Sequence, residues 1–153
     1  FFDQRLEEIL TRNVDGTHTL GLVHLEGLRG FVGNVPKPIE QQVLRQATLV
    51  LRNELRGNDI LGRWDGTTFA ILLPDTPEQA AISTLGRIQI ALSKPFTFGE
   101  GETLHLSPYV GVAVRQLGEP SGTLTEWAEA ALKQSTAGES RLVLYKTLPF
   151  SVN

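Results

Sequence analysis

A short hairpin signal in the middle of the chain constrains the fold more than any other feature. Two runs of strand-forming residues, 60–64 and 67–73, are separated only by Asp65-Gly66. An Asp-Gly pair favours the positive φ angles of a type I′ turn, the tight connection between antiparallel strands. The sequence therefore predicts an antiparallel strand pair here, with Asp65 and Gly66 as the two residues of the turn.

Helical and strand patterns alternate on both sides of this hairpin. Apolar residues recur at helical spacing over 39–55, and the segment 76–79 predicts a helix start at which Thr76 is the N-cap and Gln79 completes a capping box. A second capping box begins at Thr123. Further patterns predict a helix over 2–10 and strands over 19–25, 110–114 and 142–145. An antiparallel hairpin among helical crossovers predicts an α/β (α+β) domain, in which helices surround a mixed sheet with a split βαβ, ferredoxin-like core.

Composition limits the class of protein. The chain has 153 residues, the size of one domain, so we expect a single domain over 1–153. Its net charge of −3 argues against a nucleic-acid partner, and no apolar run approaches the roughly 20 residues that span a bilayer. We therefore expect a cytoplasmic domain without direct membrane contact. The sequence starts inside a helical pattern without Met, which predicts an N-terminally truncated fragment of a longer protein.

Independent catalytic or metal motifs are missing from the sequence. There is no cysteine, and the three histidines His18, His24 and His105 stand far apart. Neither a nucleophile elbow nor a P-loop pattern occurs. We therefore expect no metal site, and taken alone the residues predict a globular α/β domain without a defined activity.

One segment carries a family resemblance. Residues 63–76, RWDGTTFAILLPDT, resemble the signature hairpin of GGDEF domains, the diguanylate cyclases that condense two GTP molecules into cyclic di-GMP. The helix over 39–55, the break at 93–96 and the strands near 110 and 142 follow in the family's order. The resemblance implies a nucleotide-cyclase-like fold over almost the whole chain.

The resemblance also implies that the catalytic positions have been lost. The family's G-G-[DE]-E-F signature is replaced by Asp65, Gly66, Thr67, Thr68 and Phe69, so both acidic positions are threonine. His24 stands where the family has a metal-binding aspartate. Because Mg²⁺ prefers carboxylate oxygens, we expect neither Mg²⁺ nor another cofactor to bind at these degenerate positions.

The substrate positions that the resemblance implies are altered too. Val32 replaces the guanine-binding asparagine, and Gln41 replaces the second guanine contact. Thr136 aligns with a phosphate-binding lysine, and Asp65 brings a negative charge to where the backbone approaches phosphate. These losses predict a degenerate cyclase fold that is not an enzyme, and they disfavour residual GTP binding.

Three other residues match the family's product-binding inhibitory site. Arg56 and Asp59 form an R-x-x-D motif shortly before the signature, and Arg87 aligns with a third member of that site. Arginine can bind guanine or phosphate through two parallel hydrogen bonds, and a carboxylate can accept from guanine. The alternative is structural, with Arg56 at a helix C-terminus, Asp59 in a turn and Arg87 on a solvent-exposed face.

The sequence thus favours an inactive, bacterial GGDEF-like regulatory domain. In this interpretation it binds cyclic di-GMP and signals to a partner or to attached domains of its parent protein. The alternative is a nucleotide-free interaction or dimerisation module. A homodimer is compatible with both, because the family brings two domains together.

Overall fold

The computed structural model describes residues 18–26, 37–98, 101–115, 121–138 and 141–145. The predicted helix over 2–10 lies outside these residues. In chain order the described elements are β1 (His18–Glu26), α2 (Lys37–Glu54), β2 (Ile60–Asp65), β3 (Thr68–Leu73), α3 (Glu78–Leu92), β4 (Phe96–Phe98), β5 (Glu102–Leu104), β6 (Ser107–Arg115), α4 (Ser121–Ala137) and β7 (Leu142–Leu144). None of the described helices is long and apolar enough to cross a membrane.

Five strands form one mixed sheet in the order β2-β3-β1-β6-β7. The pairs β2–β3, β3–β1 and β1–β6 are antiparallel, whereas β6 and β7 are parallel. The strands β4 and β5 form a separate small antiparallel pair that the sequence patterns did not predict. The predicted α/β fold with a mixed sheet is confirmed.

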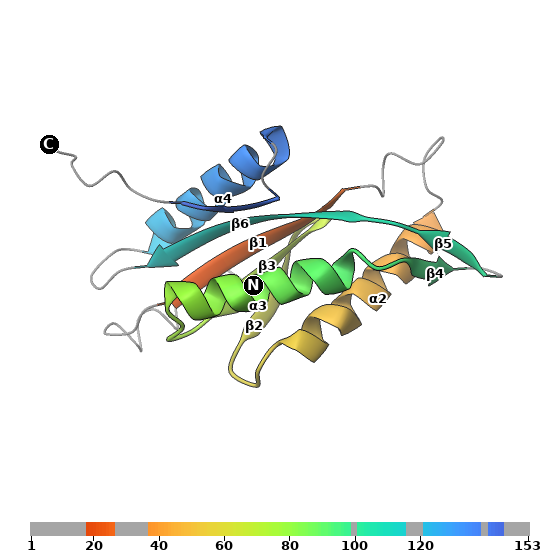
Figure 1. Ribbon diagram of the computed structural model, residues 1–153, viewed down its shortest axis with the longest axis horizontal. Coiled ribbons are helices and arrows are strands. Elements are labelled where there is room, and N and C mark those ends of the chain that lie inside the picture. Colours follow the sequence, from red (N-terminus) through yellow and green to blue (C-terminus); the bar gives the residue numbers. More distant parts are fainter. Residues whose placement is uncertain (1–17, 27–36, 99–100, 116–120, 139–140, 146–153) are drawn as a thin grey trace, which may run out of the picture.

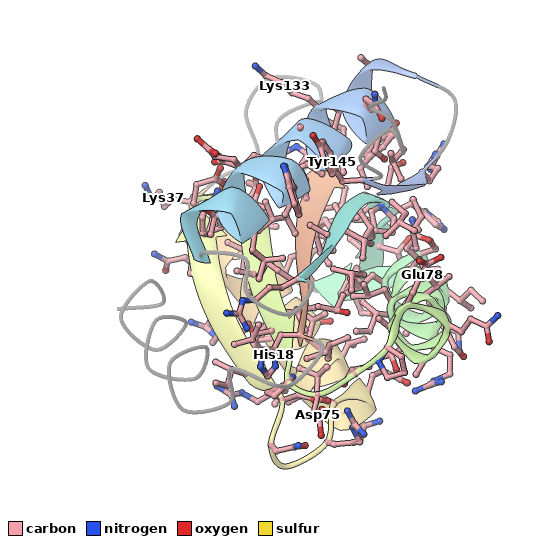
Figure 2. The ribbon with its side chains drawn as sticks, turned by 90° about the vertical axis from the view of Figure 1, so that its left-hand side faces the viewer. His18, Lys37, Asp75, Glu78, Lys133 and Tyr145 are labelled. Carbon is pink, nitrogen blue, oxygen red and sulfur yellow. The ribbon has the colours of Figure 1, made fainter. Side chains whose placement is uncertain are left out.

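Helices cover both faces of the sheet (Figure 1), because the central strands are apolar on both sides. On β1, Val23 and Leu25 face α2 and α3, while Leu20 and Leu22 alternate with them and face α4. Figure 2 shows the resulting layers, with α4 on one side of the sheet and α3 on the other. The domain therefore has two hydrophobic cores, one on each face of the sheet.

The layer containing α4 approaches the sheet very closely at Gly111 on β6. A Cβ atom added there would lie 2.3 Å from the Leu132 backbone nitrogen and 2.6 Å from the Ala128 carbonyl oxygen. Glycine is thus required by contact between two backbones. This close packing fixes where α4 stands beside the β2–β3 hairpin.

The hairpin turn differs from the predicted one. The last pair across the turn is Asp65 with Thr68, so Gly66 and Thr67 form the connection, and a register shift follows between Arg63 and Asp65. Among described residues only Asp75 and Gly101 have positive φ angles, which rules out a type I′ turn at residues 65–66. Instead the Asp65 carboxylate accepts a hydrogen bond of 3.1 Å from the Thr67 N–H. Closure by this side chain explains why positive φ is not needed.

Both predicted helix caps need correction. The helix α3 begins at Glu78 with Pro77 at its N-cap, and no side chain caps it. Thr76 lies one residue earlier, where its hydroxyl donates to the Pro74 carbonyl oxygen at 2.9 Å. The helix α4 begins at Ser121, so Thr123 lies inside its first turn rather than at the cap.

Candidate functional site

A cleft of about 720 Å³ opens between the β2–β3 hairpin, the end of β1 and α4. It brings together four residues that the sequence analysis singled out: His24, Asp65, Thr68 and Thr136. Trp64 also lines the cleft and packs against the core beneath α4. We call this region the acidic cleft, for the charges described below.

His24 makes a closed set of hydrogen bonds at the end of β1. Its Nε2 lies 3.1 Å from the Glu26 carboxylate, and its Nδ1 lies 2.9 Å from the Thr68 hydroxyl. Because a carboxylate only accepts, Nε2 carries the proton in the neutral ring, and Nδ1 accepts from the hydroxyl. The Thr67 hydroxyl lies 3.4 Å from the same nitrogen. The side chains of His24, Glu26 and Thr68 thus hydrogen-bond to one another at the end of β1, and the described residues contain no cluster of three or more histidine, cysteine or carboxylate side chains that could hold a metal ion.

The charge of the cleft is predominantly negative. Its lining contains four carboxylates and one ammonium group: Glu26, Asp65, Glu126, Glu129 and Lys133. The Trp64 indole nitrogen donates to Glu129 at 3.2 Å, so the aromatic ring joins the hairpin to α4. Sequence analysis missed Lys133, which lies on α4 (Figure 2). Its position three residues before Thr136 places both on one helix face and was the available signal.

A second groove lies on the other side of the hairpin turn. It has a volume of about 510 Å³ and is lined by Arg63 of β2, by Gly66 of the turn and by residues of α2 that include Gln41. The family resemblance implies that Val32 and Gln41 replace the two guanine contacts of the family. Gln41 does line this groove, whereas Val32 lies outside the described residues.

Arg56 and Asp59 meet in the tight turn between α2 and β2. The Asp59 carboxylate accepts from the Arg56 backbone N–H at 2.8 Å and from its guanidinium at 3.4 Å. The Asp59 side chain is only 1% exposed, but that of Arg56 is 63% exposed. Asp59 therefore closes the turn and orients Arg56, while the guanidinium keeps a face toward solvent.

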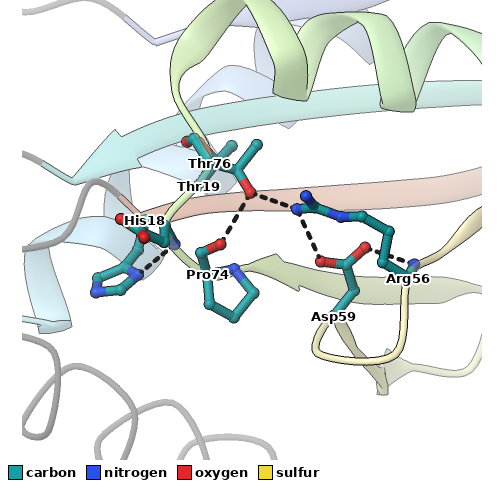
Figure 3. A network of polar contacts seen from close by, with 7 residues as sticks. His18, Thr19, Arg56, Asp59, Pro74 and Thr76 are labelled. Carbon is teal, nitrogen blue, oxygen red and sulfur yellow. Dashed lines mark hydrogen bonds and ion pairs between the residues drawn. The ribbon is translucent and has the colours of Figure 1, made fainter.

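Behind Arg56 a network extends into the sheet (Figure 3). The guanidinium donates to the Thr76 hydroxyl at 2.8 Å, and the Thr19 hydroxyl on β1 donates to the Thr76 carbonyl oxygen at 2.9 Å. The buried His18 at the start of β1 accepts from the Asp75 N–H at 3.0 Å. This network attaches the exposed arginine to the central strand, and it gives Thr76 a role that its predicted position at a helix cap did not indicate.

Arg87 lies on α3 and makes different contacts. Its Nε donates to Glu54, the last residue of α2, at 3.4 Å, and its side chain is 54% exposed. Among described residues no hydrogen bond or ion pair joins Arg87 to Arg56 or Asp59. The contact with Glu54 places Arg87 at the end of α2, and Glu54 precedes Arg56 by two residues. Arg56, Asp59 and Arg87 therefore lie near the same helix end but do not form one cluster.

Known proteins resemble this chain in sequence. Residues 1–141 match the family described as "Diguanylate cyclase, GGDEF domain". Diguanylate cyclase DgcP of Pseudomonas aeruginosa is 31% identical over 146 residues, which cover 91% of this chain but only 21% of DgcP. The chain thus spans about a fifth of the length of this curated relative.

Solved structures resemble the chain in fold. The GGDEF domain of DgcB from Caulobacter crescentus, solved in complex with c-di-GMP, has a TM-score of 0.85 at 22% identity and covers 95% of this chain and 89% of its own. Diguanylate cyclase SiaD from Pseudomonas aeruginosa, solved with its activator SiaC, has a TM-score of 0.81 at 26% identity and covers 92% and 55%.

Proposed function

This chain belongs to the GGDEF family of diguanylate cyclase domains, and we propose that it is a catalytically inactive member that binds cyclic di-GMP and signals to a partner or an attached domain. The proposal rests on the exposure and the orientation of the Arg56 side chain. Its guanidinium is exposed yet held from behind by Asp59 and Thr76. An arginine oriented in this way offers its remaining donors to guanine or phosphate at a reduced entropic cost.

The chemistry at the end of β1 supports inactivity. Attack on an α-phosphate depends on a divalent cation that neutralises the developing charge, and such a hard cation prefers carboxylate oxygens beside the phosphates of the substrate. At the corresponding positions this chain has an imidazole and hydroxyls, and His24 and Thr68 already bind each other. A cation at this point would have to break that hydrogen bond, and neither His24 nor Thr68 offers it a carboxylate oxygen in return.

The charge of the acidic cleft supports the same conclusion. A triphosphate placed between the hairpin and α4 would meet four carboxylates and one lysine. Like charges at close range repel one another, and the repulsion grows where solvent is excluded. GTP binding in this orientation is therefore opposed by the side chains that surround it.

The proposed ligand site consists of Arg56 as the principal contact, with Asp59 orienting it and Arg87 as a second cation. Arg87 can turn toward a ligand at the end of α2, because its contact with Glu54 is long, 3.4 Å, and exposed. An exposed ion pair of this kind contributes little stability and is readily exchanged for a ligand.

Titration calorimetry with cyclic di-GMP tests the binding proposal. We expect micromolar affinity for the unaltered protein, and at least a tenfold loss for Arg56→Ala and for Arg87→Ala, since charge-assisted hydrogen bonds contribute ~1.5–3 kcal/mol each. Arg52→Ala is the matched control, because Arg52 is an exposed arginine in the last turn of α2 outside the proposed site. Absence of binding by folded protein, or an equal loss in the control, would refute the proposal.

Incubation with GTP and Mg²⁺ or Mn²⁺ tests inactivity separately. We expect no cyclic di-GMP above the level of a protein-free sample by chromatography. Turnover at any enzyme-dependent rate contradicts this part of the proposal and leaves the binding result unaffected.

A second candidate function is a nucleotide-free interaction module. The observation in its favour is that the Asp59 carboxylate is buried and already accepts two hydrogen bonds, so it has little capacity left for guanine. In that case Arg56→Ala leaves every activity of the parent protein intact. The calorimetric experiment above separates the two candidates.

A further inference from the structure

The carboxylate of Asp59 is already engaged within the protein. Its side chain is 1% exposed, and both of its oxygens accept hydrogen bonds from Arg56 (Figure 3). A guanine base presents two adjacent donors on its Watson–Crick edge, N1–H and the 2-amino group, and a carboxylate is the side chain that accepts from both. Asp59 would have to release Arg56 to reach this edge, so a different carboxylate is needed to recognise guanine at the proposed site.

Glu54, the last residue of α2, supplies a carboxylate at the same helix end. It precedes Arg56 by two residues, and its Oε1 lies 3.4 Å from the Nε of Arg87. Its side chain is 27% exposed, and within the described part of the chain it makes no other ion pair or side-chain hydrogen bond. The carboxylate therefore keeps most of its accepting capacity at the place where both arginines of the proposed site lie.

The position of Glu54 on α2 is electrostatically unfavourable. The C-terminus of a helix carries a partial negative charge, which favours a cation and opposes a carboxylate. Arg52 in the last turn of α2 follows this rule, whereas Glu54 does not. The exposed 3.4 Å contact with Arg87 offsets little of the cost. A residue that breaks a local rule without a strong structural contact in return is a candidate for a role in function.

We propose that Glu54 accepts hydrogen bonds from a guanine of cyclic di-GMP and determines the base specificity of the site, an inference that rests on the proposed function. Glu54 accepts from N1–H and from the 2-amino group, while Arg56 uses its remaining donors for O6 and N7 or for phosphate. Arg87 exchanges Glu54 for a ligand phosphate, so charge-assisted contacts to the ligand replace an exposed ion pair. Asp59 orients Arg56 and does not contact the base.

A carboxylate at this position distinguishes guanine from similar bases. Hypoxanthine keeps N1–H, O6 and N7 but lacks the 2-amino group, so it loses one hydrogen bond to Glu54. A site that pairs with a polar group of its ligand rejects an analogue without that group, because the partner in the protein is left unsatisfied. The preference for guanine over hypoxanthine therefore reports on the carboxylate, independently of the phosphate contacts.

Titration calorimetry with cyclic di-GMP and with its inosine analogue, cyclic di-IMP, tests the role of Glu54. For the unaltered protein we expect cyclic di-GMP to bind about tenfold more tightly than cyclic di-IMP, the effect of one charge-assisted hydrogen bond. Glu54→Gln should weaken cyclic di-GMP binding about tenfold and reduce the preference to less than about threefold, because the amide replaces one accepting oxygen with a donor. A change in folding or in phosphate binding would affect both ligands equally and leave the preference unchanged.

Two control variants make the result specific. Glu40→Gln removes a carboxylate from the first turn of the same helix, about 21 Å away at 1.5 Å per residue, and should retain the preference for cyclic di-GMP. Asp59→Asn should weaken the binding of both ligands, because Arg56 loses part of its support, and should also retain the preference.

The possible results separate this inference from the proposed function. If the unaltered protein binds neither ligand, the proposed function fails and the role of Glu54 fails with it. If the unaltered protein binds both ligands equally, or if Glu54→Gln keeps the preference or binds cyclic di-GMP more tightly, only the role of Glu54 is overturned. A preference that is lost in Asp59→Asn and kept in Glu54→Gln would assign the base contact to Asp59 and overturn this inference as well.

Discussion

Replacement of Gly111 by alanine tests the close approach of α4 to the sheet. The added Cβ would lie 2.3 Å from the Leu132 backbone nitrogen, whereas ordinary contact begins at 3.4 Å. All three atoms nearest to it belong to the backbone of α4, so no side-chain rotation relieves the clash. The helix must move away from β6 by about 1 Å, the difference between these distances.

The cost follows from the core that this movement opens. The core between α4 and the sheet contains Leu20, Leu22 and Leu72 from the strands, which pack with Leu124 and Ala128 of α4. A gap of about 1 Å removes roughly a quarter to a half of the van der Waals energy of each contact that it stretches. We expect a loss of about 3 kcal/mol in the free energy of unfolding, at the upper end of overpacking effects, and a fall in Tm of about 6–12 °C for a domain of this size.

Gly86 in the middle of α3 provides the matched control. A Cβ there meets nothing within 4 Å, so Gly86→Ala should stabilise the helix by about 0.5–1 kcal/mol. Urea unfolding followed by tryptophan fluorescence measures both variants, because Trp64 and Trp127 each pack against the affected core. If the free energies of unfolding of Gly111→Ala and Gly86→Ala differ by less than about 1 kcal/mol, the backbone contact at Gly111 is not as close as described.

Three further substitutions test other parts of the structure. Thr19→Val removes the buried donor to the Thr76 carbonyl oxygen and should cost about 1–3 kcal/mol in urea unfolding; an unchanged midpoint would contradict that hydrogen bond. Asp75→Gly relieves a φ of 53° and should raise the free energy of unfolding by up to about 1 kcal/mol, whereas a decrease would show that the aspartate side chain stabilises this turn. The double substitution His24→Asp, Thr67→Glu restores two carboxylates and should create Mn²⁺ binding, detected by electron paramagnetic resonance, that the unaltered protein lacks; equal signals from both proteins would argue against the assignment of these positions.

Much of the fold could be predicted from the sequence, because its signals are local. The hairpin over residues 60–73 and the helix over 39–55 are visible as apolar periodicity and turn residues, and both exist with small shifts at their ends. The turn type was wrong because the Asp65 side chain closes the turn itself. The position of the α3 cap was wrong because Thr76 makes long-range hydrogen bonds that local patterns do not reveal.

The candidate site divides in the same way. Family resemblance located His24, Asp65 and Thr68, which the structure brings into one cleft. The contribution of Lys133 depends on which face of α4 meets the hairpin, and that is a property of tertiary packing. The exposure of the Arg56 side chain and the burial of the Asp59 side chain could not be predicted, because both are charged residues in a turn and the sequence does not distinguish their exposure.

The central strand β1 has the Arg56 network near its first residues and the acidic cleft at its last ones. From Thr19 to His24 the strand rises about 17 Å. Hydrogen bonds to β3 on one side and β6 on the other hold it along this length. A ligand of ordinary size at one end therefore does not touch the other, and each end can accumulate substitutions without disturbing its opposite. This modularity makes the two ends separately engineerable: residues near the hairpin can be exchanged to add or remove an activity while the arginine end serves as an unchanged internal reference.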